Sequence, residues 1–421
     1  MDINHLLSGI DCACGMRHEC DIEAVWAESG AISRLTALCE RYDRILLVAD
    51  ENTYAAAGEK TEAALSGKIG ARVIFGKEIL IPNEAAIDRV TQALGDAALI
   101  VGIGSGVIQD LCKYVSKASF LPYMVVATAP SMDGYASTGA AMILGGMKET
   151  VPAGLPRAIV ADVDVLKNAP MEMLAAGFGD IIGKYSALAD WKLSVAVTGE
   201  RFCPFIYDTT YACIEKVKSM AEGITARDGE AVKALFEALI TVGIMMSFLG
   251  NSRPASGSEH HLSHFFEISG IVKELPYLTH GIDVAYSTVI TAKLREAICA
   301  RTFPERRFRE DGRITEEKLV RAYGEKVAKG CVALQKKVGA YTRDLTPVYK
   351  EKEAEIKKIL SEVPSAKALE ATLSLVHLDM KDFYALYGEE RITEAVRYAK
   401  DLKDRYTVLW LWYDLFGEEE I

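Results

Sequence analysis

The first half of the chain alternates short runs of β-branched and other apolar residues with longer segments of helical periodicity. Near-continuous apolar strands separated by helices are typical of a parallel sheet covered on both faces, because neither strand face then meets water. The sequence therefore predicts an α/β domain. Its expected strands are Ile45 to Ala49, Arg72 to Phe75, Ala98 to Gly102, Tyr123 to Thr128 and Ala158 to Ala161.

Beyond Ala161 the strand pattern ends, and helical periodicity dominates from about Met171 to Phe416. Pro170 suits the first turn of a helix, where its missing N–H group costs nothing. A chain of 421 residues has room for two or three domains at roughly 150 residues each. We predict an α/β domain over residues 1–165 and an all-α domain over residues 166–421.

Charge and composition exclude several classes of partner. The chain has 48 basic and 59 acidic residues and a net charge of −11, so we expect neither nucleic acid nor an anionic membrane as a partner. Apolar stretches such as Ala238 to Leu249 fall short of the ~20 residues of a spanning helix, and the N-terminus lacks a signal pattern. The nine cysteines lack framework spacing, which favours reduced thiols. These features predict a cytoplasmic protein without membrane insertion.

A glycine-rich turn follows the third predicted strand. Gly102, Gly104, Ser105 and Gly106 lie where a buried strand gives way to a helix. Glycines there allow close approach of a ligand, and the N–H groups of the new helix attract a pyrophosphate. The spacing is not G-x-G-x-x-G, so a tight turn without a ligand is an equal alternative.

Polar residues follow two other predicted strands. Asp50 could accept hydrogen bonds from an adenosine ribose, or it could cap the helix that begins near Asn52. Thr128, Ser131 and Asp133 follow the strand that ends near Thr128, where open α/β sheets bind ligands. The alternative for this segment is ordinary turn chemistry.

Four of the seven histidines fall within 21 residues: His260, His261, His264 and His280. His260 and His264 share one helix face, whereas His280 opens the next apolar helix. Two imidazoles and one carboxylate make a divalent-metal site with an open position, as in catalytic sites. Solvent or core histidines are the alternative.

Asp180 is the candidate for the carboxylate, because it lies in an apolar, glycine-flanked segment where an unpaired charge is costly. A helix N-cap is the alternative role for Asp180.

A second cluster comprises Cys12, Cys14, His18 and Cys20. These residue types suit zinc, although C-x-C is tighter than the usual C-x₂₋₄-C spacing. An ordered strand or loop with free thiols is the interpretation that this spacing favours.

The glycine turn, Asp180 and the histidine set together resemble the metal-dependent polyol dehydrogenase superfamily, which includes glycerol dehydrogenase, iron-containing alcohol dehydrogenase and dehydroquinate synthase. Within it the chain is most similar to the glycerol-1-phosphate dehydrogenase family, including its bacterial branch. The motifs that carry the resemblance are Gly102 to Asp110, Thr128 to Ser137, Gly177 to Lys184 and Ser252 to His260.

The resemblance implies a dehydroquinate synthase-like fold: an N-terminal Rossmann-like dinucleotide-binding domain, and a helical domain that binds metal and substrate. It implies a divalent metal on Asp180, His260 and His280. It also implies a role in phospholipid biosynthesis. The implied cofactor-binding residues are Gly104, Ser105 and Gly106 for the pyrophosphate and Thr128 and Ser131 on the nicotinamide side, and the implied contact to the substrate hydroxyl is Asp133. We add Asp50, from its position after a predicted strand, and Asp110, at the end of the glycine motif, as further candidates for cofactor binding.

The implied reaction is the reversible reduction of dihydroxyacetone phosphate by NAD(P)H to sn-glycerol 1-phosphate, with the metal as Lewis acid. We expect Arg253 to bind the phosphate or to support its binding, with Lys184 as a further contact; the alternative for Arg253 is a pair with an internal acid. His264 either relays a proton or orients His260.

Three other functions stay open: a polyol dehydrogenase for unphosphorylated substrates, a dehydroquinate-synthase-like lyase, and a metal-binding or regulatory protein. The donor set suits zinc, nickel or iron, and it does not choose between them. The preference for NADH or NADPH also stays open. Exposed apolar residues on the long helices favour a homodimer or a larger homo-oligomer.

Overall fold

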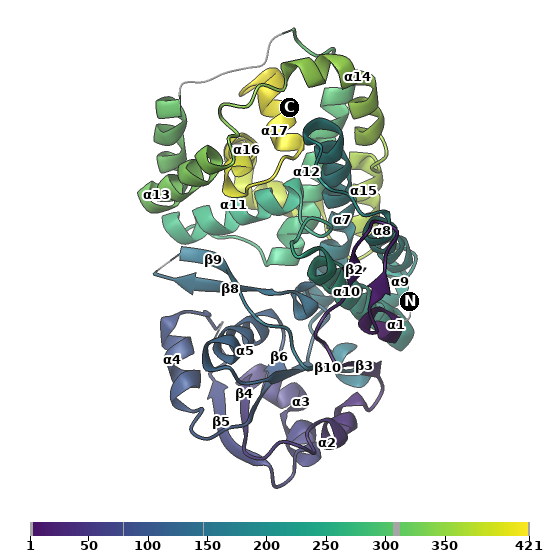
Figure 1. Cartoon of the computed structure of the whole chain (residues 1–421), viewed down its shortest axis with the longest axis vertical. Helices are drawn as coiled ribbons and strands as arrows, with labels where there is room; N and C mark the ends of the chain where they lie inside the picture. The colour runs from purple at the N-terminus through teal and green to yellow at the C-terminus, as the bar shows by residue number, and fades with distance from the viewer. Residues whose placement is uncertain (1–2, 79, 146, 306–311, 420–421) are drawn as a thin grey trace. The chain divides into compact units, whose positions relative to one another are not determined.

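The computed structural model describes residues 3–78, 80–145, 147–305 and 312–419 (Figure 1). The chain forms two compact units: the first comprises residues 1–181 and 215–252, and the second comprises residues 182–214 and 253–421. These units do not follow the domain boundary predicted between residues 165 and 166. Residues 166–181 and the segment that contains helix α10 (Gly229–Leu249) belong to the same unit as the sheet.

A six-stranded parallel sheet forms the centre of the first unit, in the order β3-β10-β7-β6-β4-β5. All five predicted strands are confirmed: β4 (Ile45–Asp50), β5 (Ile69–Phe75), β6 (Leu99–Gly104), β7 (Tyr123–Ala127) and β10 (Ala158–Asp162).

The sequence analysis missed the edge strand β3 (Ala24–Glu28), whose side chains are mostly half-buried and lack a long apolar run. It also missed two hairpins, formed by β1 (Ile10–Asp11) with β2 (Arg17–His18) and by β8 (Gly139–Leu144) with β9 (Met147–Pro152). Strands β1 and β2 have two residues each, which is too short for a periodic pattern to detect.

Apolar side chains cover both faces of this sheet. On one face Leu47, Val101 and Val126 are fully buried and join a core cluster with Leu35 and Leu65 from the neighbouring helical segments. The helices and 3₁₀ turns of the unit up to the middle of the chain are α1 (Ile3–Leu7), η1 (Ala31–Arg34), α2 (Leu35–Leu38), α3 (Glu51–Ala64), α4 (Glu84–Gln92), α5 (Gly106–Ser119), η2 (Gly134–Ala136) and α6 (Val163–Leu166).

Helices follow α6, as predicted for the second half of the chain. Helix α7 (Met171–Thr198) begins directly after Pro170, whose carbonyl accepts from the N–H groups of Met173 and Leu174. Helices α7 and α8 (Pro204–Lys218) each contribute to both units. Among the described residues, those beyond 252 form helices and turns only: α11 (Ser258–Lys273), α12 (His280–Ala300), α13 (Gly312–Lys337), α14 (Thr346–Leu360), α15 (Ala366–Ser374), α16 (Met380–Tyr398), η3 (Ala399–Leu402) and α17 (Val408–Phe416).

Helix α10 packs in the first unit, after the short helix α9 (Ala221–Thr225). Asp228 caps its start by accepting from the Ala231 N–H group at 2.9 Å, and Gly250 ends it with a positive φ of 72°. With 21 residues, α10 is longer than the apolar stretch noted in the sequence, and it is long and apolar enough to cross a membrane. However, 72% of its most apolar window is buried, as in the core helix of a soluble protein.

Candidate active site

The first half of the candidate site lies at the carboxyl ends of the central strands. From β4 the chain moves outward to β5, and it then returns to β6 on the other side of β4. Such a reversal of direction opens a crevice at the carboxyl ends of the two strands, where α/β sheets bind ligands. Asp50 ends β4 and Gly104 ends β6, so both residues flank this crevice.

Close packing explains two of the glycines in the turn. A Cβ on Gly102 would lie 2.8 Å from Cys112 Sγ, and one on Gly104 would lie 2.6 Å from Ile108 Cβ, so α5 packs directly on β6. Ser105 is the N-cap of α5 but makes no side-chain capping bond. The amide groups of the first turn of α5 can therefore serve a phosphate. Asp110, one turn further along α5, lies 3.5 Å from Lys113 Nζ.

Asp50 has the capping role that the sequence left open. Its Oδ1 accepts from the Thr53 N–H group at 2.8 Å, and Thr53 Oγ1 accepts from the Asp50 N–H group at 3.1 Å. This capping box starts α3 one residue earlier than expected, at Glu51. A ribose contact by Asp50 stays a prediction.

The loop after β7 is fixed at both of its ends. Thr128 is buried, and its N–H group donates to the Gly104 carbonyl at 3.2 Å, which joins the ends of β7 and β6. Further along, the Tyr135 hydroxyl donates to the Ala129 carbonyl at 2.8 Å. Ser131 is half-buried between them. The polar residues predicted to face the cofactor therefore sit on an ordered loop.

Asp180 is fully buried within α7, so the N-cap alternative is wrong. Its Oδ2 accepts from the Asp133 N–H group at 2.9 Å. Gly177 makes this approach possible, because a Cβ on Gly177 would lie only 1.8 Å from the Pro130 carbonyl oxygen. Helix α7 and the loop after β7 thus meet backbone to backbone, and Asp180 is held by the chain segment that carries Asp133.

The second unit brings three of the predicted histidines together. His260 and His264 lie one turn apart on α11, and His280 is the first residue of α12. The ring centroids are 5.1 Å apart for His260 and His280, 5.6 Å for His264 and His280, and 6.3 Å for His260 and His264. His261, in contrast, is fully buried elsewhere on α11 and takes no part in this group of rings.

Glu259 is a site residue that the sequence analysis missed. Its buried carboxylate lies 2.7 Å from His260 Nδ1 and also accepts from the Gly257 N–H group at 2.9 Å. A carboxylate on one ring nitrogen of a histidine orients the ring and leaves Nε2 for a metal. Burial, followed by the charges of Lys184 and His280, lowers the pKa of His260 well below its usual value, which favours the neutral ring.

Positive charges surround His260 within the second unit. Lys184 is fully buried on α7, and Lys403 and Arg405, which the sequence analysis did not select, both lower the pKa of His260. Burial and the charge of Arg253 lower the pKa of Arg405 to about 10, which leaves it charged at neutral pH. The basic residues near the C-terminus could have been noticed in the sequence, but their distance from His260 along the chain hid the connection.

Arg253 has the internal-acid role that the sequence left as the alternative. Its guanidinium binds the Glu200 carboxylate through two nitrogens, at 3.0 and 2.6 Å, and donates to the Tyr406 carbonyl at 2.8 Å. Because these bonds occupy a buried side chain, they favour a supporting role for Arg253 over direct phosphate binding.

Comparison with known proteins places these features in a family. Residues 26–170 match the family model described as iron-containing alcohol dehydrogenase. Glycerol-1-phosphate dehydrogenase [NAD(P)+] from Geobacillus stearothermophilus is 34% identical over 66% of this chain and 71% of its own length. The Bacillus licheniformis protein of the same name is 28% identical over 94% of this chain and 90% of its own length.

The fold also matches solved structures. NADH-dependent butanol dehydrogenase A from Thermotoga maritima aligns with a TM-score of 0.60 over 92% of this chain and 91% of its own, at 14% identity. This likeness confirms the predicted dehydroquinate synthase-like fold, with a Rossmann-like part and a helical part. The sequence relatives are closer, and they show that the chain belongs to the glycerol-1-phosphate dehydrogenase family of the iron-containing alcohol dehydrogenases.

Proposed function

We propose that this protein reduces dihydroxyacetone phosphate to sn-glycerol 1-phosphate with NAD(P)H, reversibly. The observation that carries the proposal is the geometry at His260, whose imidazole is held by Glu259, lies beside His280 and is surrounded by cationic side chains. The relatives named above are glycerol-1-phosphate dehydrogenases that use NAD(P)+. A polyol dehydrogenase, a lyase and a metal-binding regulator are not favoured by these relatives.

The metal ligands in this proposal are Asp180, His260 and His280, one carboxylate and two imidazoles. Asp180 is a buried carboxylate, and a cation would balance its charge. One carboxylate and two neutral imidazoles leave a net positive charge on a divalent ion, and they suit zinc, nickel or iron. When bound, the metal would polarise the ketone carbonyl, and the reduced nicotinamide would supply hydride.

In this proposal, residues of the chain hold the nicotinamide cofactor and the substrate in place and move a proton. The turn from β6 into α5, with Gly104, Ser105 and Gly106, binds the pyrophosphate, and Thr128 and Ser131 orient the nicotinamide side. Asp133 contacts the substrate hydroxyl, and its N–H group fixes Asp180. His264, the third ring of the group, donates or accepts the proton at the new hydroxyl, or it orients His260.

Lys184, Lys403 and Arg405 suit a phosphorylated substrate. Their charges act at His260, so a phosphate bound near the metal would meet positive potential there. Arg405 also donates to the Ser256 carbonyl at 2.9 Å, which holds its guanidinium against the start of α11. We assign the phosphate to these side chains, with Arg253 as support.

The proposal also includes the cellular compartment and the oligomeric state of the protein. A metabolic reductase of a phosphorylated ketone, with α10 mostly buried, is expected to work in the cytoplasm as a homo-oligomer without membrane insertion. The product would serve phospholipid biosynthesis.

The metal dependence can be tested by loading the purified protein with zinc, nickel or iron and following nicotinamide oxidation with dihydroxyacetone phosphate. We expect turnover with at least one metal, and its loss after chelation. The variants Asp180→Ala and His260→Ala should lose both metal and turnover, whereas His261→Ala should keep its bound metal, since His261 lies outside the group of rings. Turnover that survives chelation, or that persists in His260→Ala, would refute the assigned metal site.

A further inference from the structure

The N-terminal hairpin carries a second cluster of metal-ligand side chains, outside the candidate active site. Strands β1 and β2 pair in antiparallel register, with Ile10 opposite His18. Between them the Cys12 N–H group donates to the Met16 carbonyl at 3.0 Å, and the Gly15 N–H group donates to the Cys12 carbonyl at 2.9 Å. Gly15 adopts a φ of +83°, which glycine allows at little cost. This tight turn brings the two cysteines to the strand that carries His18.

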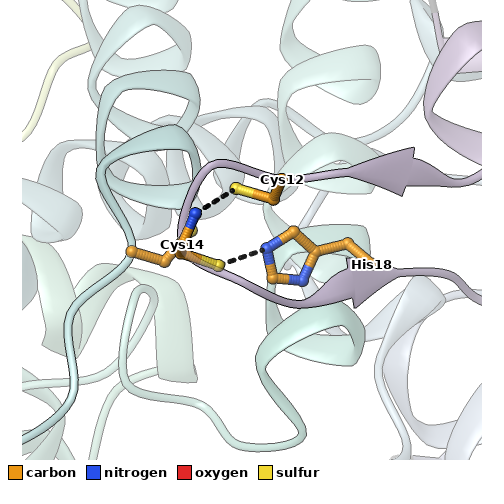
Figure 2. Close-up of side chains that lie close together, drawn as sticks. Cys12, Cys14 and His18 are labelled. Carbon is orange, nitrogen blue, oxygen red and sulfur yellow. Dashed lines mark hydrogen bonds between the residues drawn. The ribbon is translucent and has the colours of Figure 1, made fainter.

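The side chains of the turn point toward one another (Figure 2). Cys14 Sγ lies 3.4 Å from His18 Nε2, and the Cys14 N–H group donates to Cys12 Sγ at 3.5 Å. In a tetrahedral zinc site with bonds of about 2.3 Å to sulfur and 2.0 Å to nitrogen, the two ligand atoms lie about 3.5 Å apart. The Cys14–His18 distance therefore fits a shared ion.

His18 is fixed in the orientation that a ligand needs. Its ring is 1% exposed and stacks on Phe248 of α10, with centroids 5.4 Å apart and planes 13° apart. Stacking prevents the ring from turning away from the cysteines. A buried histidine whose Nε2 faces a cysteine sulfur has the geometry of a metal ligand.

Cys12 and Cys14 are half-buried, and together with His18 they offer two sulfur atoms and one ring nitrogen to an ion. Cys20, which the sequence analysis grouped with these three residues, is not among the side chains that could share an ion with them.

We propose that Cys12, Cys14 and His18 bind one zinc ion, separate from the metal proposed at the active site. Two thiolates and one imidazole are typical zinc donors, and they leave one tetrahedral position for a further ligand. Each thiol releases its proton when the ion binds. Soft sulfur donors select zinc over magnesium, calcium or manganese. The ion would fix the tight turn between β1 and β2.

The experiment measures the metal content and the cobalt spectrum of the full-length protein. His260→Ala empties the active site, so its remaining zinc reports the cysteine site alone. We expect about one zinc per chain in His260→Ala and none in the double variant His260→Ala, Cys14→Ser. Reconstitution of His260→Ala with cobalt should give intense thiolate-to-cobalt absorption, which an Asp/His/His site does not produce. Cys20→Ser is the matched control, because it removes a neighbouring thiol outside the group.

Equal zinc in the double variant and in His260→Ala, or cobalt protein without thiolate absorption, would overturn the proposal. A disulfide would also overturn it, and thiol titration of the unfolded, unreduced protein distinguishes this case by counting fewer than the nine thiols of the sequence. If Cys14→Ser fails to fold, the cobalt spectrum of His260→Ala still decides between the outcomes.

Discussion

At the scale of single residues, the candidate site depends on what holds each ligand. Glu259 and Asp133 act through their neighbours: the first binds His260 through its carboxylate, and the second holds Asp180 through its backbone N–H group. The sequence alone points to the candidate metal ligands, because four histidines within a short segment are easy to recognise. It does not show the contacts of Glu259 and Asp133 to these ligands, because such contacts depend on the folded geometry.

Glu259→Gln tests the support of the metal ligand. Glutamine keeps the size of the side chain but removes the charge that orients and polarises His260. We expect metal affinity to fall about 10–100-fold, with little change in NAD(P)H binding. Competition with a chromogenic chelator measures the first quantity, and nicotinamide fluorescence measures the second. Unchanged metal affinity would show that the contact to Glu259 is incidental.

Arg405→Gln tests the phosphate assignment. Removal of a charge-assisted contact worth about 1.5–3 kcal/mol should raise the KM for dihydroxyacetone phosphate about 10–100-fold. The KM for unphosphorylated dihydroxyacetone, which lacks the phosphate, serves as the internal control. If both KM values rise equally, Arg405 supports the site without binding phosphate.

At the scale of elements, the sequence predicted the five central strands and the helix that carries His260, because long buried strands and long helices leave strong periodic patterns. It missed β3, which lies at the edge of the sheet, and the two hairpins, whose strands pair only with each other. The sequence analysis also selected Asp50 and Arg253 for ligand contacts. In the structure Asp50 caps α3 and Arg253 binds the Glu200 carboxylate, which are the roles given as alternatives. A residue type alone does not distinguish a ligand contact from a helix cap or an internal ion pair.

Gly177→Ala tests the backbone contact between α7 and the loop after β7. The added Cβ would overlap the Pro130 carbonyl oxygen at 1.8 Å, so one of these segments must move. Overpacking of this kind costs about 1–3 kcal/mol, and we expect a lower melting temperature together with weaker metal binding. Gly330→Ala is the control, because an exposed helical glycine with no atom near its Cβ should be neutral or slightly stabilised by alanine. Equal melting temperatures for both variants would refute the contact.

At the scale of the whole molecule, the sequence predicted an acidic enzyme that assembles with itself. Val272, Leu275 and Tyr277 lie at or just after the end of α11, and each is more than 40% exposed. Large apolar side chains clustered on a surface favour an interface. Analytical ultracentrifugation should therefore give a mass that is a multiple of 46.0 kDa, and Leu275→Glu should reduce it. A single 46.0 kDa species for the unmodified protein would contradict the predicted oligomer.

The most direct test of the account is the reaction itself. Metal-loaded protein and NADH or NADPH should consume dihydroxyacetone phosphate much faster than dihydroxyacetone, and the product should be sn-glycerol 1-phosphate. An enzyme specific for sn-glycerol 3-phosphate should then fail to oxidise that product. Formation of the 3-phosphate, or equal rates with the unphosphorylated ketone, would contradict the proposed function.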